Sequence, residues 1–106
     1  MPYVRLDEVG AREMIPGYHG KFVHGDLMTV AHWEIDAGAP MPVHSHPHEQ
    51  SINVIEGRFE LSVAGESLVM EPGTVYMIPG GVPHSGRALA FCRIIDVFTP
   101  VREEYR

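Results

Sequence analysis

Three histidines stand at alternate positions, His44, His46 and His48, and Gln50 and an apolar run follow them. Side chains two residues apart in an extended strand point to the same side, so His44 and His46 should converge on one point. Neutral imidazole is the commonest protein ligand for several transition metals, and two imidazoles on a stiff strand need only one or two further ligands. The stretch therefore predicts half of a metal site.

A further imidazole is available from residues 73–84. There a strand-like run ends at Pro79, Gly80 and Gly81, and His84 follows shortly after. Proline and glycine mark the turns between strands, so His84 should begin a new strand directly after a tight reversal. A fold that brings the two stretches together would complete the site.

The spacing of these residues resembles the two signature motifs of the cupin superfamily. The first is glycine, five residues, His-x-His, three or four residues, Glu, six residues and glycine, and its places are taken here by Gly38, His44, His46, Gln50 and Gly57. The second is glycine, five residues, Pro-x-Gly, two residues, His, three residues and Asn, and its places are taken by Gly73, Pro79, Gly81, His84 and Ala88. Gln50 replaces the usual Glu, and Ala88 replaces the usual Asn.

This resemblance implies an all-β fold, a single-domain cupin (a double-stranded β-helix or jelly-roll barrel) over residues 1–106. It also implies one divalent metal ion, which could be Zn, Ni, Mn or Fe. Carried over position by position, the metal ligands are His44, His46, Gln50 and His84. Two alternatives stay open: His48 could be a further ligand, and Gln50 could hydrogen-bond a ligand histidine instead of binding the metal.

The whole-chain composition limits the possible partners. The formal net charge is -6 with only eight Lys and Arg residues, which argues against nucleic acid or an anionic membrane surface as a partner. One cysteine, Cys92, cannot form an internal disulfide, and the N-terminus lacks the basic-then-apolar pattern of a secretory signal. No apolar run has the length of a membrane span. A cytoplasmic protein that binds a small molecule is expected.

Many short strands separated by glycine and proline turns are expected along the chain. They cover residues 2–8, 18–24, 27–35, 50–55, 58–63, 66–70, 74–78 and 90–98. Residues 9–15 should form a helical turn, and residues 37–42 a turn. The predicted core contains Trp33, Ile52, Val54, Phe59, Leu61 and Val63. Barrels of this size commonly pair through their outer sheet faces, so a homodimer is expected.

Asp96 lies inside the apolar run of residues 90–98. A carboxylate costs several kcal/mol to bury unless it is paired, bound to metal or used in chemistry. Asp96 is therefore either a structural residue, which pairs with an arginine or faces solvent, or a functional group.

The runs HSHPHEQ, IEGRFEL, IPGGVPH and IDVFTPVRE resemble the KdgF-type cupins of pectin and alginate breakdown. Those proteins convert 4,5-unsaturated uronate monosaccharides to the linear 5-keto-4-deoxyuronate. The resemblance implies that Asp96, Phe98 and Arg102 line the substrate pocket of a metal-dependent isomerase. The substrate would be an anionic sugar acid.

The residue types fit such a reaction. Asp96 could be the general acid and base, and the planar guanidinium of Arg102 matches a carboxylate with two parallel hydrogen bonds. Phe98 offers an apolar wall for the ring. Tyr76 is a further candidate for substrate contact or proton donation, and Arg58 and Arg93 are alternative partners for the carboxylate.

Two other functions are compatible with the same residues, because one fold supports many activities. One is a metal-dependent dioxygenase or other oxidoreductase that acts on a small molecule. The other is a non-catalytic cupin that binds a sugar or metabolite.

Overall fold

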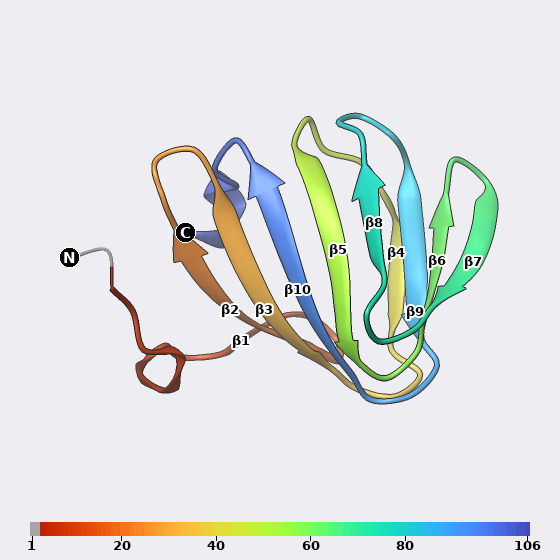
Figure 1. The fold of residues 1–106 in the computed structure, drawn as a ribbon, viewed down its shortest axis with the longest axis horizontal. Coiled ribbons are helices and arrows are strands. Elements are labelled where there is room, and N and C mark those ends of the chain that lie inside the picture. Colours follow the sequence, from red (N-terminus) through yellow and green to blue (C-terminus); the bar gives the residue numbers. More distant parts are fainter. Residues whose placement is uncertain (1–2) are drawn as a thin grey trace.

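Two antiparallel β-sheets packed face to face make up the computed structural model, which describes residues 3–106 (Figure 1). The larger sheet has the strand order β1-β2-β3-β10-β5-β8, and the smaller one β4-β9-β6-β7. The strands are β1 (Arg12–Ile15), β2 (Tyr18–His24), β3 (Thr29–Ile35), β4 (Pro40–His44), β5 (Glu49–Glu56), β6 (Phe59–Val63), β7 (Glu66–Met70), β8 (Val75–Ile78), β9 (His84–Ala88) and β10 (Cys92–Thr99). The all-β prediction is confirmed.

The helical pieces of residues 3–106 are two short 3-10 turns, η1 (Leu6–Glu8) and η2 (Glu103–Tyr105). No helix within the described range has the length and apolar character to cross a membrane.

Alternate side chains of the strands fill the space between the two sheets. In β3 the buried residues are Thr29, Ala31, Trp33 and Ile35, and in β10 they are Cys92, Ile94, Asp96 and Phe98. Successive side chains of a strand point to opposite faces, so both sets share the inner face of the larger sheet. The six predicted core residues are all buried, which confirms that part of the sequence analysis. Three polar residues lie on this mainly apolar face: Thr29, Asp96 and, on β5, Gln50.

The predictions for the N-terminal segment and for residues 37–42 are wrong. Instead of an edge strand over residues 2–8 the structure has the η1 turn, with Pro2 outside the described residues, and instead of a helical turn over residues 9–15 it has β1. A single helical turn is marginal by itself, whereas β1 gains hydrogen bonds to β2 across a turn at Gly17, which has a φ of +87°. Similarly, the turn predicted at residues 37–42 ends early, because Pro40 already pairs with Arg87 of β9.

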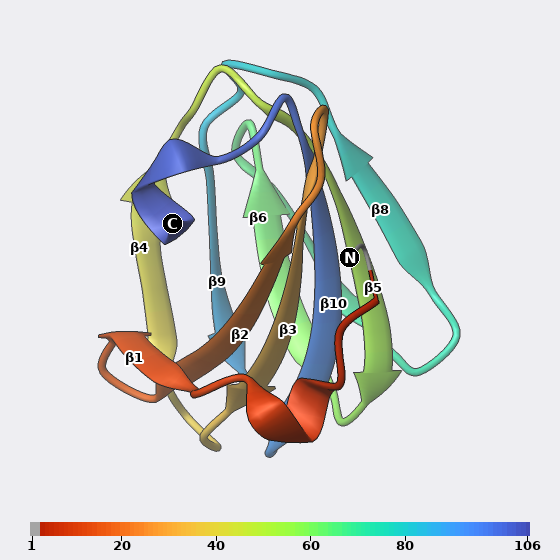
Figure 2. The ribbon, with the colours of Figure 1, turned by 90° about the vertical axis from the view of Figure 1, so that its left-hand side faces the viewer.

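The β4–β5 and β8–β9 loops lie side by side at one end of the two sheets (Figures 1 and 2). The backbone N–H of Gly81 donates a hydrogen bond of 2.8 Å to the carbonyl oxygen of His46. A Cβ atom at Gly80 would lie 2.3 Å from the carbonyl oxygen of Pro47, so only glycine permits this approach. The Pro79-Gly80-Gly81 turn thereby brings the two histidine-bearing loops together.

Candidate metal centre

His44, His46 and His84 converge between the two sheets, with one ligand atom of each within 4.8 Å of the others. His44 ends β4 and His84 begins β9, and the two residues are direct partners in the antiparallel ladder. His46 comes from the β4–β5 loop. Its alternate position was expected to follow from one extended strand, but β4 already ends at His44.

The three imidazole rings are oriented by backbone carbonyl groups. His44 Nδ1 lies 2.9 Å from the oxygen of Pro42, His46 Nδ1 lies 3.1 Å from that of His48, and His84 Nδ1 lies 2.9 Å from that of Val82. A carbonyl only accepts, so each Nδ1 carries the proton and each Nε2 keeps its lone pair.

His84 Nε2 is buried and has no hydrogen-bond partner among residues 3–106. Three neutral imidazoles, held by carbonyl groups and with their lone pairs available, are a donor set that fits a divalent transition metal. The residues present could therefore hold such an ion.

Gln50, on β5, places its Oε1 atom 3.0 Å from His46 Nε2. Burial, with a contribution from the charge of Arg102, lowers the pKa of His46 to about 4, so the ring is neutral at pH 7 and its one N–H faces His48. His46 Nε2 and Gln50 Oε1 would then both be acceptors, and two arrangements make their contact favourable. Either the amide turns so that its NH2 donates to Nε2, or Oε1 and Nε2 bind the same cation.

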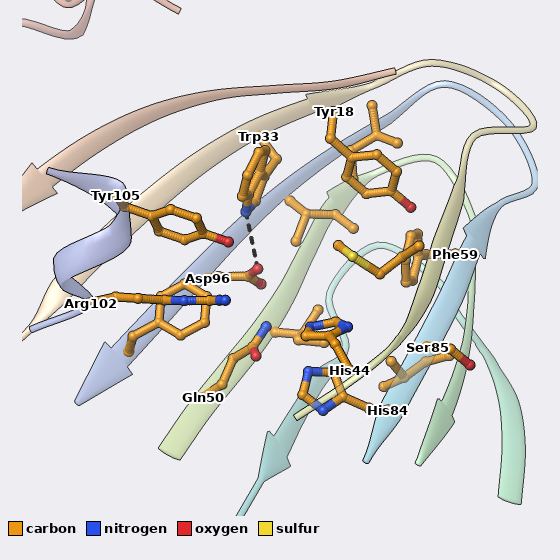
Figure 3. A pocket seen from close by; sticks show the side chains of 16 residues that line it. Tyr18, Trp33, His44, Gln50, Phe59, His84, Ser85, Asp96, Arg102 and Tyr105 are labelled. Carbon is orange, nitrogen blue, oxygen red and sulfur yellow. Dashed lines mark hydrogen bonds between the residues drawn. The ribbon is translucent and has the colours of Figure 1, made fainter. Parts of the chain in front are cut away.

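A cavity opens beside the cluster and is shown in Figure 3. Six of the predicted site residues line it: His44, Gln50, His84, Asp96, Phe98 and Arg102. The space between the lining atoms is about 450 Å³ with the open mouth included. A cavity of this volume suits one small molecule rather than a polymer chain.

Tyr76 and His48 lie apart from this cavity, and His46 belongs to the histidine cluster but is not a lining residue. Tyr76, on β8, is half-buried against the core and is not among the lining residues. His48 is buried in the β4–β5 loop, where its Nε2 lies 3.3 Å from the carbonyl oxygen of Val101, and it is not part of the three-histidine cluster.

Asp96 is buried, and its two carboxyl oxygens have different surroundings. Trp33 Nε1 donates a hydrogen bond of 3.1 Å to Oδ2, whereas Oδ1 is buried without a partner among the described residues (Figure 3). Burial raises the pKa of Asp96 to about 7, although the Trp33 N–H, the charge of Arg102 and the nearby Gln50 amide act in the opposite direction. The side chain does not face solvent, and within residues 3–106 it forms no ion pair.

Arg102 follows β10 and turns back over the cavity. Its side chain is 12% exposed, and its Nε donates a 2.9 Å hydrogen bond to Glu104. The guanidinium carbon lies 4.8 Å from the ring centre of Phe98 and 4.4 Å from that of Tyr105. These contacts fix the plane of the guanidinium by cation–π attraction.

The two alternative arginines lie elsewhere. Arg58 pairs with Glu71 at 3.7 Å, and Arg93 pairs with Glu34 and Glu56. Neither lines the cavity, so Arg102 is the arginine that the fold brings to it.

Sequence reasoning missed Tyr105 and placed Trp33 only in the core. Tyr105 lies in η2, and its ring stacks on Phe22 with centres 4.4 Å apart. It lines the cavity, and burial raises the pKa of its hydroxyl to about 12. No periodic pattern marks a residue that reaches the interior from a folded-back tail.

A chain of hydrogen bonds holds this tail. The backbone N–H of Arg102 donates to Thr29 Oγ1 at 2.9 Å, and Thr29 Oγ1 lies 2.8 Å from His24 Nδ1. His24 Nε2 lies 3.2 Å from the carbonyl oxygen of Tyr105. If the Thr29 hydroxyl donates to Nδ1, then Nε2 carries the ring proton and donates to Tyr105, which satisfies every atom.

Thr29→Val is expected to lower the free energy of unfolding by about 1–3 kcal/mol, since it leaves a partly buried N–H and a ring nitrogen unpaired. Valine fills the same space, so the loss would come from the hydroxyl. Thr29→Ser, which keeps that hydroxyl, is the matched control and should lose about 1 kcal/mol for one methyl group. Urea unfolding measures both. A valine variant as stable as the wild type would contradict the proposed chain of hydrogen bonds.

Fold and site together define a small all-β protein in which two sheets enclose a three-histidine cluster. The Cupin_2 family model, described as a cupin domain, matches residues 31–98, and the chain belongs to this family.

Solved structures and a known enzyme resemble the chain. An RmlC-like cupin from Shewanella frigidimarina has a TM-score of 0.93 and 25% sequence identity, with 98% of this chain and 95% of that one covered. KdgF from Halomonas sp. has a TM-score of 0.92 and 29% identity, with 98% and 99% covered. Quercetin 2,3-dioxygenase of Bacillus subtilis is 34% identical over 64 residues, which are 59% of this chain and 19% of that enzyme. The resemblance to cupins and to KdgF is confirmed.

Proposed function

We propose that the protein is a metal-dependent enzyme that converts 4,5-unsaturated uronate monosaccharides to linear 5-keto-4-deoxyuronate. The observation that carries the proposal is the unpartnered, buried Oδ1 of Asp96, in a carboxyl group that lines one cavity with His44, His84 and Arg102. Similarity to KdgF over nearly the whole of both chains supports it. The substrate class is a small anionic sugar acid.

The reaction is an isomerisation in which atoms and electrons balance. The hydroxyl at C1 loses its proton, the bond from C1 to the ring oxygen breaks, and an aldehyde forms at C1. The ring oxygen keeps the bonding pair and takes up a proton, which gives an enol across C4 and C5. The enol then loses its O–H proton while C4 gains one, which leaves a ketone at C5. The enzyme therefore has to hold the ring and move protons.

Each task has a residue in the cavity. Asp96 takes and returns protons through Oδ1, the oxygen that has no other partner. Arg102 binds the substrate carboxylate through its outer N–H groups, and Phe98 contacts the ring. A divalent ion on His44, His46, His84 and Gln50 would act as a Lewis acid toward the sugar oxygens, with its charge little reduced by the neutral Gln50.

The test is to mix metal-loaded protein with 4,5-unsaturated galacturonate and follow the loss of the C4=C5 ultraviolet absorbance. A no-enzyme sample and chelator-treated protein are the controls. Acceleration that depends on the metal is expected. If the wild type leaves the rate of absorbance loss unchanged, the proposal is wrong.

Arg102→Gln is expected to raise the KM for the uronate about 10-fold or more, because a bidentate contact to the carboxylate is lost. Arg58→Gln removes a similar charge outside the cavity and should leave the KM unchanged. Steady-state kinetics on both variants separate a local contact from an effect of overall charge. Equal KM values for the two variants would remove Arg102 from substrate binding.

A second candidate function is oxidation of a small molecule by a dioxygenase reaction. The observation that favours it is the 64-residue match to quercetin 2,3-dioxygenase, although the chain spans only 19% of that enzyme. An oxygen electrode with iron- or copper-loaded protein distinguishes the two reactions, because the isomerisation consumes no oxygen. Uronate binding without turnover or oxygen uptake would instead indicate a non-catalytic binding protein.

A further inference from the structure

We propose that Trp33 is a positioning residue for the reaction, because its indole N–H fixes which oxygen of Asp96 exchanges protons with the substrate. This inference rests on the proposed function. Trp33 and Asp96 come from neighbouring strands, β3 and β10, and both side chains point to the inner face of the larger sheet. The Nε1–Oδ2 hydrogen bond of 3.1 Å joins them (Figure 3).

An indole N–H can only donate, so Oδ2 is an acceptor in both protonation states of Asp96. The proton of the acid form is then favoured on Oδ1, because the unprotonated oxygen of a carboxylic acid is the stronger acceptor for the indole N–H. Oδ1 is also the oxygen without another partner, in a carboxyl group that lines the cavity. Trp33 thus leaves one defined oxygen for proton transfer, while a carboxyl group without this bond could turn about its Cβ–Cγ bond.

The indole ring is itself held in place. It makes edge-to-face contacts with Tyr18, Phe22 and Tyr105, with ring centres 6.1, 5.3 and 5.8 Å apart. The indole ring also packs over Gly20 of β2, where an added Cβ atom would lie 2.7 Å from the ring. A donor fixed on this many sides keeps its direction, which is the requirement for a preorganised proton-transfer group.

Trp33→Phe keeps an aromatic ring among these contacts but removes the N–H. We expect kcat to fall about 10- to 100-fold, since the reacting oxygen is no longer held, with KM within about twofold because Arg102 is untouched. Val54→Ala is the matched control. Val54 is buried but does not line the cavity, so this variant should lower stability and leave kcat nearly unchanged.

A double-mutant cycle with Asp96→Asn tests whether Trp33 acts through Asp96. In the wild-type background Trp33→Phe should lower kcat by the full 10- to 100-fold. In the Asp96→Asn background it should lower kcat by less than about threefold, because the group that Trp33 positions no longer transfers protons. An equal loss in both backgrounds would show that Trp33 is structural. A wild type with no activity on the uronate would overturn the proposed function together with this role, whereas an active wild type with an additive cycle overturns the role alone.

A second readout does not depend on activity. Trp33 is the only tryptophan of the chain, so the indole N–H gives a single proton resonance. In the metal-loaded protein this resonance should shift, and its exchange with solvent should accelerate about 10-fold or more, when Asp96→Ala removes the acceptor. Unchanged shift and exchange rate would show that the hydrogen bond is not formed, which also overturns the proposal.

Discussion

His84→Ala is expected to lower metal affinity about 100-fold or more and to reduce uronate turnover to near the rate of the chelated protein. Loss of an outer-sphere partner alone typically costs 10- to 100-fold in affinity, and His84 offers a lone pair directly. Its Nε2 is buried without a hydrogen bond, and its Nδ1–H is fixed by Val82. Equilibrium dialysis against Zn²⁺ or Ni²⁺, followed by elemental analysis, measures the change.

The control is His19→Ala. His19 is partly exposed and lies 3.4 Å from Asp36, outside the three-histidine cluster, so this variant should bind metal like the wild type. Thermal unfolding gives an independent reading: metal at 100 times its dissociation constant stabilises the folded state by about 2.7 kcal/mol. That stabilisation should persist in His19→Ala and vanish in His84→Ala. Equal metal occupancy in the two variants would exclude His84 as a ligand.

The histidine cluster could be predicted because local rules place its members. A turn of proline and glycine puts His84 at the start of β9, and antiparallel pairing then sets it opposite His44. The alternation argument for His46 gave the right convergence for the wrong reason, since this residue lies in a loop after β4. Here the spacing of a motif was more informative than the secondary structure assumed for it.

The contact between Trp33 and Asp96 could not be predicted, because the two residues are 63 positions apart in the chain and meet only through the register of their strands. Alternation shows that each residue can face inward but not that they meet. Tyr76 illustrates the converse. It shares a face with Ile78 as predicted, yet β8 is an edge strand of the larger sheet, and the residue lies outside the cavity lining.

The two ends of the chain were the least predictable parts. β1 depends on hydrogen bonds to β2, and η2 depends on the contacts of Tyr105 with Phe22 and the hydrogen bonds at Thr29. Such tertiary contacts decide the conformation of short segments whose own propensities are weak. The homodimer and the cytoplasmic location stay predictions.

Asp96→Asn is expected to lower kcat by about 10²–10⁴, the usual contribution of a general acid or base, and at the same time to raise stability above neutral pH. Burial raises the pKa of Asp96 from 3.8 to about 7, so the folded protein holds a proton that the unfolded chain releases. The stability linked to this proton is present below pH 3.8 and is lost as the pH rises through 7. Asparagine cannot ionise, and its oxygen still accepts the Trp33 N–H.

At pH 8 the metal-free Asp96→Asn protein should therefore be more stable than the metal-free wild type, by up to about 4 kcal/mol for a shift of this size, and at pH 4 the two should nearly coincide. Urea unfolding at pH 4, 6 and 8 measures the difference. Asp36→Asn, at an exposed position, is the control and should show no such trend. Parallel stability curves for Asp96→Asn and wild type would show that the carboxyl group is not destabilised by burial. A gain in stability together with a loss of turnover is the trade-off expected of a group kept for chemistry.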